Sequence, residues 1–183
     1  MIFTKRYLDE QVQKNVILEH SAFDKREERS EYDVFISYSW NDRSYAHKIV
    51  RLLEKSGYTV YIDYNDYRLD RNNVSKTTAQ CLISQMKKCK GLLHLYSPNA
   101  SISKWCPWEV GVFSGIKNFK CANLPLLDNA TDDLKKQEYL EIYPYVDYEI
   151  AKNTANYDFW INEHSKKYVS LRAWLNGQEP YER

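Results

Sequence analysis

Short apolar runs alternate with amphipathic segments along the chain from residue 32 onward. The runs have the length and the aliphatic and aromatic composition of strands that are buried on both faces. They predict five strands, at residues 33–38, 58–63, 91–96, 121–127 and 143–150. In the amphipathic segments apolar residues recur at helical spacing, and Gly57 stands where the first helix should stop. These segments predict helices at residues 42–56, 74–88, 103–117 and 165–175.

Strands that alternate with helices in this way build right-handed crossover units around a parallel sheet. We therefore predict an α/β domain over residues 31–178, a doubly wound, flavodoxin-like sheet of five parallel strands with helices on both faces. Pro125 in the fourth strand predicts a sheet edge or an early strand end, because proline cannot donate to the ladder. Residues 1–30 are polar and charged and are predicted to form an N-terminal helical extension and linker.

Composition and charge narrow the class of protein. The length of 183 residues suits one domain, and 43% apolar residues exclude a disordered chain. Lys and Arg total 26 against 25 Asp and Glu, which argues against a nucleic-acid partner because phosphate neutralisation needs a basic surplus. No apolar run reaches the roughly 18 residues of a membrane span, so no membrane partner is expected. Asp9 and Glu10 stand where a signal peptide would be apolar, which predicts a cytoplasmic location.

Several kinds of chemistry are excluded because their motifs are missing. The four cysteines include no C-x-x-C pair and the four histidines show no metal-ligand spacing, so we predict no metal site and expect reduced, buried thiols. The chain has only five glycines, and neither glycine-rich phosphate cradle nor a G-x-S-x-G motif occurs. The familiar nucleotide-cofactor and serine-hydrolase sites are therefore ruled out.

The positive chemical signal lies at the start of the helix predicted at residues 103–117. Trp105 and Glu109 are four residues apart, so a helix that includes both places an aromatic surface and a carboxylate on one face. Pro107 is tolerated only near a helix start, which puts Glu109 in or just after the first turn, where the helix dipole favours an ionised carboxylate. Gly111 and Gly115 are predicted to allow close packing of this helix on the sheet. Taken alone, a structural role for the Trp–Glu pair remains an alternative.

The predicted topology brings this pair to a binding position. Ligands of open α/β sheets bind beyond the carboxyl ends of the strands, where the strand order reverses. For a strand order 2-1-3-4-5 this point lies between the first and third predicted strands. The first strand ends at Tyr38, Ser39 and Trp40, and the third leads into Trp105 and Glu109. These side chains suit a ligand with a flat ring, a cationic centre and hydroxyl groups.

Three short motifs occur in order: residues 32–38 (YDVFISY) followed by Asp42, residues 61–63 (YID) before a long polar loop, and residues 105–109 (WCPWE). Together they resemble the Toll/interleukin-1 receptor (TIR) domain family, and the resemblance covers residues 31–127. The WCPWE motif resembles the TIR domains that cleave NAD⁺ at the nicotinamide–ribose bond. By that resemblance Glu109 is the catalytic carboxylate and Trp105 the aromatic platform on which the substrate stacks.

The resemblance also implies substrate contacts outside this motif. Tyr38 matches a position that lines the ligand site at the end of the first strand, and Asp63 matches one at the end of the second. Ser39 and Trp40 carry over more weakly as substrate-binding residues. NAD⁺ is then the substrate, and no further cofactor is implied. Family members are generally active only when assembled, which implies self-association or association with other TIR domains.

The implied activity is that of an NAD⁺ nucleosidase or ADP-ribosyl cyclase. A small TIR chain of this kind resembles bacterial antiphage (Thoeris-like) proteins, which make an ADP-ribose-derived signal for a separate effector. Two other classes stay open: a non-catalytic TIR scaffold, adaptor or mimic of host signalling that acts by TIR–TIR association, and a flavodoxin-like enzyme that uses Glu109 on another nucleoside. The sequence does not decide among ADP-ribose and cyclic or base-conjugated products, because water or an internal nucleophile can capture the same intermediate.

Overall fold

The computed structural model describes residues 2–14, 29–63, 75–129, 138–151 and 157–182. Its centre is a set of parallel strands in the order β3-β2-β4-β5-β6, which is the order 2-1-3-4-5 of the five predicted strands. These strands are β2 (Tyr32–Ser37), β3 (Val60–Tyr61), β4 (Cys89–Tyr96), β5 (Cys121–Leu127) and β6 (Tyr145–Ile150). The predicted α/β fold, with a doubly wound parallel sheet, is confirmed.

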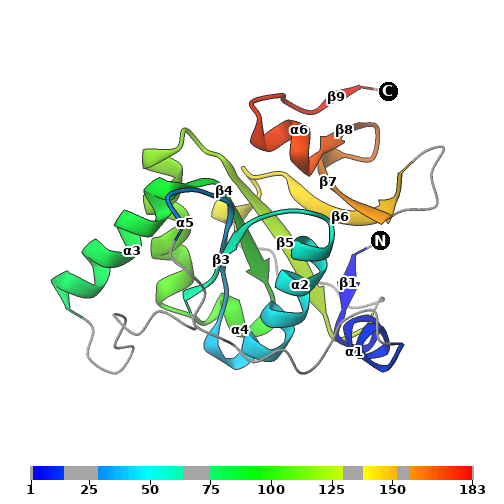
Figure 1. The fold of residues 1–183 in the computed structure, drawn as a ribbon, viewed down its shortest axis with the longest axis horizontal. Helices are drawn as coiled ribbons and strands as arrows, with labels where there is room; N and C mark the ends of the chain where they lie inside the picture. The colour runs from blue at the N-terminus through cyan, green and yellow to red at the C-terminus, as the bar shows by residue number, and fades with distance from the viewer. Residues whose placement is uncertain (1, 15–28, 64–74, 130–137, 152–156, 183) are drawn as a thin grey trace.

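Helices cover both faces of this sheet because side chains alternate along each strand. On the face that we call the α5 side, Phe35 packs in a core with residues of α3 (Lys76–Lys88) and α5 (Trp105–Ile116). On the opposite face, the α2 side, Val34 packs in a larger core with residues of α2 (Arg43–Lys55). Figure 1 shows α3 and α5 on one side of the sheet and α2 on the other. In the described ranges, no helix is long and apolar enough to cross a membrane.

Pro125 lies inside the sheet, so the predicted edge or early strand end is wrong. Strand β5 continues past it to Leu127 and has β4 on one side, where Pro125 is opposite Tyr96. On the other side β6 pairs with β5 only at Asn123, whose backbone N–H donates to the carbonyl of Pro144 at 2.8 Å. The backbone N–H groups of alternate residues point to the same neighbouring strand, so the position of Pro125 also points toward β6. At Pro125, two residues after Asn123, β6 no longer pairs with β5. The proline therefore stands where the ladder needs no donor on that side.

The C-terminal part extends the sheet in a way that the sequence pattern did not predict. Strands β7 (Tyr157–His164), β8 (Lys167–Ser170) and β9 (Tyr181–Glu182) add to β6 in antiparallel order. The helix predicted at residues 165–175 is reduced to the short α6 (Leu171–Leu175), because the preceding residues pair with β7 instead. This C-terminal unit lies together at one end of the molecule in Figure 1.

The glycine of β4 and the two glycines of α5 differ in how closely other atoms approach them. A Cβ atom at Gly91 of β4 would lie 2.6 Å from Leu175 Cδ2 and 2.9 Å from Trp174 Cζ3, so α6 can pack on β4 only because this residue is glycine. The close packing predicted at Gly111 and Gly115 is wrong. Both residues are exposed on α5, and a Cβ atom there would meet nothing within 4 Å.

The end of α2 lies at the predicted place. Gly57 follows the helix with a φ of 81°, in the left-handed region that glycine adopts without a steric penalty. Arg172 Nη2 donates to the carbonyl of Ser56 at 3.1 Å, so this turn is also tied to α6. The helix stop therefore fixes both a local turn and a contact with the C-terminal unit.

The N-terminal segment contributes to the core. Strand β1 (Phe3–Thr4) pairs in parallel with the end of β5, and α1 (Lys5–Gln13) follows it directly. Phe3 and Leu8 are fully buried in the α2-side core, and the Phe3 ring stacks on Tyr148 of β6 with centroids 5.4 Å apart. A helix thus occurs in the segment where an N-terminal helical extension was predicted. Residues 2–14 contribute to the same core as the sheet. The domain boundary at residue 31 stays a prediction.

Candidate active site

The start of α5 is held by a serine three residues before Cys106. Ser103 Oγ accepts hydrogen bonds from the backbone N–H groups of Trp105 and Cys106, each at 3.3 Å. Pro107 follows within the first turn, where its missing N–H costs nothing. Since the helix begins at Trp105, Glu109 lies one turn further on the same helical face, as the spacing predicts.

Glu109 is fixed at the carboxyl end of β2. Ser37 is the last residue of that strand, and its Oγ donates to Glu109 Oε2 at 2.5 Å. Both side chains are buried, with exposed fractions of 1% for Ser37 and 5% for Glu109. A short hydrogen bond to a carboxylate is of the strong, charge-assisted kind. The carboxylate is therefore held at the strand tip that the topology predicts for a ligand site, and it is held by a polar group.

Cys106 of α5 is a buried thiol on which the charges of both Glu109 and Asp63 act. Burial, together with the negative charges of Glu109 and Asp63, raises the pKa of the Cys106 thiol to about 12. Hydrogen bonds with Ser103 and Ser37 act in the opposite direction. At neutral pH Cys106 is therefore a protonated thiol and not a nucleophilic thiolate. Asp63, just after β3, is itself buried, with 8% of its surface exposed.

A row of polar side chains crosses the sheet beside this group. Ser37 of β2 is opposite His94 of β4, and His94 is opposite Asn123 of β5, so all three project on the α5 side. Burial lowers the pKa of His94 to about 4, although a hydrogen bond with the Ser37 backbone acts in the opposite direction. His94 is thus a neutral imidazole at pH 7, and its Nδ1 has no hydrogen-bond partner among the described residues. Asn123 Nδ2 donates to the Leu140 carbonyl at 2.8 Å.

The aromatic part of the site lies on α5. Trp105 is half-buried and packs against the α5-side core, and its ring meets that of Trp108 edge to face, with centroids 5.2 Å apart and an interplanar angle of 87°. This edge-to-face contact with Trp108 restricts the orientation of the Trp105 indole. The structure therefore combines a fixed indole and a fixed carboxylate on one helix, as the sequence predicts.

The other predicted site residues are distributed differently. Tyr38 is 4% exposed and packs in the α2-side core, so the structure places it on the opposite face from Glu109. Ser39 is buried and precedes the short helix η1 (Trp40–Asp42), where its carbonyl accepts the Asp42 N–H at 2.8 Å. Trp40 is 44% exposed, with the Arg43 guanidinium 5.1 Å from its ring centroid. Asp63 is buried just after β3, and its charge acts on the same Cys106 thiol as that of Glu109, whereas Tyr38 lies in the α2-side core.

The loops after β2 and β4 are joined by a buried carboxylate. Asp42 is 1% exposed and accepts hydrogen bonds from Ser97 Oγ at 2.5 Å and Asn99 Nδ2 at 2.7 Å. Ser97 caps the short helix α4 (Pro98–Ser101) by accepting the Ala100 N–H at 3.0 Å. Asp42 therefore fixes the two loops between which the strand order reverses.

Sequence reasoning missed three contributors to this site. Ser37, Ser103 and Cys106 each lie within one to three residues of a predicted site residue. The signal for Ser37 was its place at the end of a buried strand, where its side chain alternates with Tyr38 and so faces the other layer. The hydroxyl at Ser103, two residues before the helix start, was a capping signal.

A family model for the TIR domain matches residues 34–169. The chain belongs to the TIR-domain family. This TIR chain is 40% identical over 174 residues to "Probable 3' cyclic ADP-D-ribose synthase ThsB'" of Bacillus cereus (strain MSX-D12), an alignment that covers 92% of this chain and 87% of the relative. It is 31% identical over 97 residues to "Putative cyclic ADP-D-ribose synthase TIR2" of Cytobacillus dafuensis, which covers 51% of this chain and 25% of that protein.

Among solved structures, the TIR domain of the Toll-related receptor TRR-2 from Hydra magnipapillata matches with a TM-score of 0.47 and 17% identity. The match covers 62% of this chain and 82% of the receptor domain.

Proposed function

We propose that this TIR chain cleaves NAD⁺ at the nicotinamide–ribose bond and converts the ADP-ribose part into a cyclic product. The observation that carries the proposal is the Glu109 carboxylate, held by Ser37 at the carboxyl end of β2 and one helical turn from Trp105. The names of both relatives as cyclic ADP-D-ribose synthases support it, the first over nearly the whole chain.

The chemistry needs few catalytic groups. The nicotinamide of NAD⁺ is already cationic, so when the C–N bond breaks the electron pair returns to the ring nitrogen and nicotinamide leaves neutral. No general acid is required, unlike in a glycosidase, where the leaving oxygen must be protonated. The sugar carbon becomes oxocarbenium-like, and an ionised Glu109 beside it would stabilise the positive charge. Because Glu109 is 5% exposed, this attraction would act with little screening by water.

The product depends on what captures the sugar carbon. A hydroxyl of the same molecule forms a new C–O bond and releases its proton, which gives a cyclic product. Water gives linear ADP-ribose by the same step. The name of the Bacillus cereus relative favours the internal hydroxyl. A site closed to bulk water would favour it as well.

The remaining site residues have supporting roles in this proposal. Trp105 stacks on a ring of the substrate, with a cation–π contribution of roughly 0.5–2 kcal/mol while the nicotinamide is charged. Asp63 contacts the substrate from the end of β3, and Ser39 and Trp40 do so from the turn after β2. Tyr38, buried in the α2-side core, supports the strand end that carries Ser37 and Ser39. No metal or additional cofactor is part of the reaction.

The biological setting that we propose is antiphage defence, with a separate effector that responds to the cyclic product. The similarity to the Bacillus cereus ThsB' protein supports this setting. We also propose that the chain associates with copies of itself or with other TIR domains when it is active. The isolated chain is then expected to be weakly active at low concentration.

The decisive test is the substitution Glu109→Gln, which keeps the shape of the side chain and removes its charge. Purified protein is incubated with NAD⁺ over a range of protein concentrations, and nicotinamide, ADP-ribose and cyclic products are resolved by chromatography. Glu109→Gln should abolish nicotinamide release, whereas Glu31→Gln, an exposed glutamate before β2, should leave it unchanged. Turnover at the wild-type rate in folded Glu109→Gln protein would rule out the catalytic role, and a wild type that releases no nicotinamide at any concentration would favour a scaffold.

A further inference from the structure

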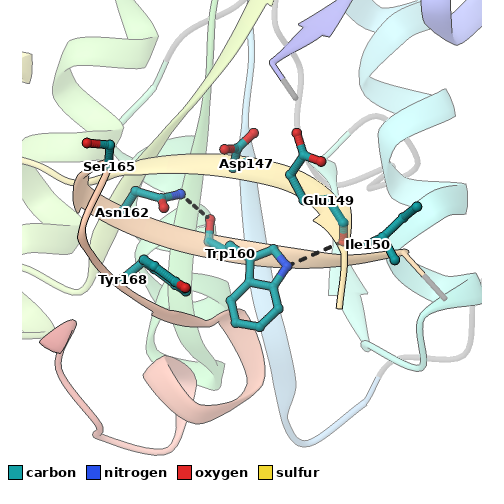
Figure 2. Close-up of a pocket in the computed structure, with 7 residues that line it drawn as sticks. All are labelled: Asp147, Glu149, Ile150, Trp160, Asn162, Ser165 and Tyr168. Atoms are coloured by element: carbon teal, nitrogen blue, oxygen red, sulfur yellow. Dashed lines mark hydrogen bonds between the residues drawn. The ribbon is translucent and has the colours of Figure 1, made fainter. Parts of the chain in front are cut away.

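A hollow lies on the C-terminal extension of the sheet, and Glu109 is not among the residues that line it. Its volume is about 230 Å³. Figure 2 shows the seven side chains that line it, which come from β6, β7, the turn after β7, and β8. They are Asp147, Glu149, Ile150, Trp160, Asn162, Ser165 and Tyr168. The NAD⁺ reaction proposed above uses none of them.

The register of β6 and β7 brings the polar lining together on one face. Val146 and Tyr148 of β6 enter the α2-side core, so Asp147 and Glu149 between and after them project from the opposite face. Asp147 is directly opposite Trp160 of β7. Two carboxylates thus share a face with an indole, and the seven lining residues include no basic side chain.

A buried amide adds a third acceptor. Asn162 is only 6% exposed, and it lines the hollow next to Tyr168, its partner on β8. Its Nδ2 donates to the backbone carbonyl of Trp160 at 3.2 Å, which fixes the orientation of the amide. The Oδ1 of this amide is an acceptor, and a donor on a ligand in the hollow could bind to it.

Two aromatic rings complete the lining. The rings of Trp160 and Tyr168 meet edge to face, with centroids 5.7 Å apart and an interplanar angle of 83°. The indole Nε1–H donates to the backbone carbonyl of Glu149 at 3.4 Å, so the ring is tied to β6 as well (Figure 2). The hollow therefore offers fixed π-faces beside acceptor oxygens.

We propose that this hollow binds a guanidinium group. A guanidinium ion is planar, always charged, and carries five N–H donors and no acceptor. It can donate to the carboxylates of Asp147 and Glu149 and to Asn162 Oδ1 while its plane stacks on Trp160. The volume of the hollow is below the roughly 300 Å³ at which pockets begin to hold whole drug-sized ligands. The hollow therefore suits a single guanidinium group and is too small for a dinucleotide.

The test is a titration of the ¹⁵N-labelled full chain with n-butylguanidinium, followed by NMR at the Trp160 indole N–H signal. That signal is assigned by its loss in Trp160→Phe. The matched probe is n-pentylammonium, which has the same charge and similar length but no planar donor group. We expect a saturable shift with the guanidinium and binding at least roughly threefold weaker with the ammonium, because only the planar ion matches the acceptors and the ring.

Variants test the named acceptors. Asp147→Asn and Glu149→Gln should each weaken guanidinium binding roughly three- to tenfold, and Glu31→Gln, an exposed glutamate outside the hollow, should not change it. The proposal is overturned by the absence of a saturable shift, by equal binding of the two cations, or by unchanged binding in both hollow variants.

Two further arms identify the source of the group. Agmatine represents a free small molecule, and a hexapeptide with one central arginine represents a protein partner, with the lysine peptide as its control. Tighter binding of the arginine peptide would assign the hollow to a protein-borne arginine, and tighter binding of agmatine to a small metabolite. The same titration in Glu109→Gln protein should give an unchanged affinity. The guanidinium site and the proposed NAD⁺ reaction can therefore fail separately.

Discussion

The hydrogen bond from Ser37 to Glu109 provides a sharp test of how the carboxylate works. Replacing Ser37 by alanine removes the hydroxyl that donates to Glu109 Oε2 at 2.5 Å and leaves the strand and the carboxylate in place. We expect a loss of kcat with little change in KM, because the bond positions Glu109 toward the reacting carbon and does not touch the rest of the substrate.

The magnitude follows from the kind of bond. A hydrogen bond to a charged group contributes about 1.5–3 kcal/mol. If all of it is needed to hold the carboxylate in the transition state, kcat should fall roughly 10- to 150-fold, at about 1.4 kcal/mol for each factor of ten. Ser37→Cys keeps the shape and a weaker donor, so its kcat should lie between those of wild type and Ser37→Ala.

The assay is the rate of nicotinamide release at saturating and at limiting NAD⁺, with thermal unfolding of each variant as a check on the fold. The matched control is Ser114→Ala. Ser114 is a buried serine on α5, the helix that carries Glu109, and its hydroxyl lies 2.6 Å from the hydroxyl of Tyr143. It should lose stability without a comparable loss of kcat. The double variant Ser37→Ala/Glu109→Gln should be as inactive as Glu109→Gln alone, because the two residues act as one unit.

A folded Ser37→Ala protein with the kcat of the wild type would refute the reasoning. An equal loss of kcat in Ser114→Ala would refute it as well, since the effect would then come from general weakening of α5.

Three other substitutions test the packing and titration of the fold. In the folded protein the pKa of His94 is about 4, so below about pH 6.5 the unfolded chain binds a proton at this residue that the folded chain does not. The free energy of unfolding should therefore fall by roughly 3 kcal/mol between pH 7 and pH 4 because of His94. In urea titrations, the free energy of unfolding of His94→Gln should depend less on pH over this range. Equal slopes for the two proteins would contradict the assignment. Gly91→Ala should lower the free energy of unfolding by about 1–3 kcal/mol, since its Cβ would lie 2.6 Å from Leu175 Cδ2. Gly111→Ala should raise the free energy of unfolding by up to about 1 kcal/mol, because alanine has the higher helix propensity and its Cβ would meet no atom within 4 Å. A lower free energy of unfolding in urea titrations would show that the exposed face of α5 does not accept a methyl group.

Much of the candidate site was readable in the primary structure because it depends on local spacing. The interval of four residues between Trp105 and Glu109, with Pro107 between them, predicts a helix start near Trp105 and a shared face. Helix α5 begins at Trp105, two residues after the start of the predicted range 103–117. The placement of Tyr38 could not be read in this way. A residue at a strand tip can face either layer, and only the register of β2 against β4 shows that Ser37 faces α5 and Tyr38 the α2 side.

The C-terminal half shows the limits of pattern reading more clearly. Residues 165–175 have a helical arrangement of apolar positions, yet residues 167–170 pair with β7, because strand pairing is a long-range interaction that local propensity does not encode. Pro125 misled for a related reason. Whether a missing N–H matters depends on which neighbour pairs at that residue, and β6 departs from β5 just before it.

The order of strands and helices, the start of α5 and the pairing of an indole with a carboxylate are properties of the amino-acid sequence itself, since they follow from periodicity and backbone geometry over a few residues. The hydrogen bond from Ser37 to Glu109, the joining of two loops by Asp42, and the hollow on β6, β7 and β8 exist only in the folded chain. They bring together groups that are far apart along the chain, and such proximity is set by how sheets and helices pack.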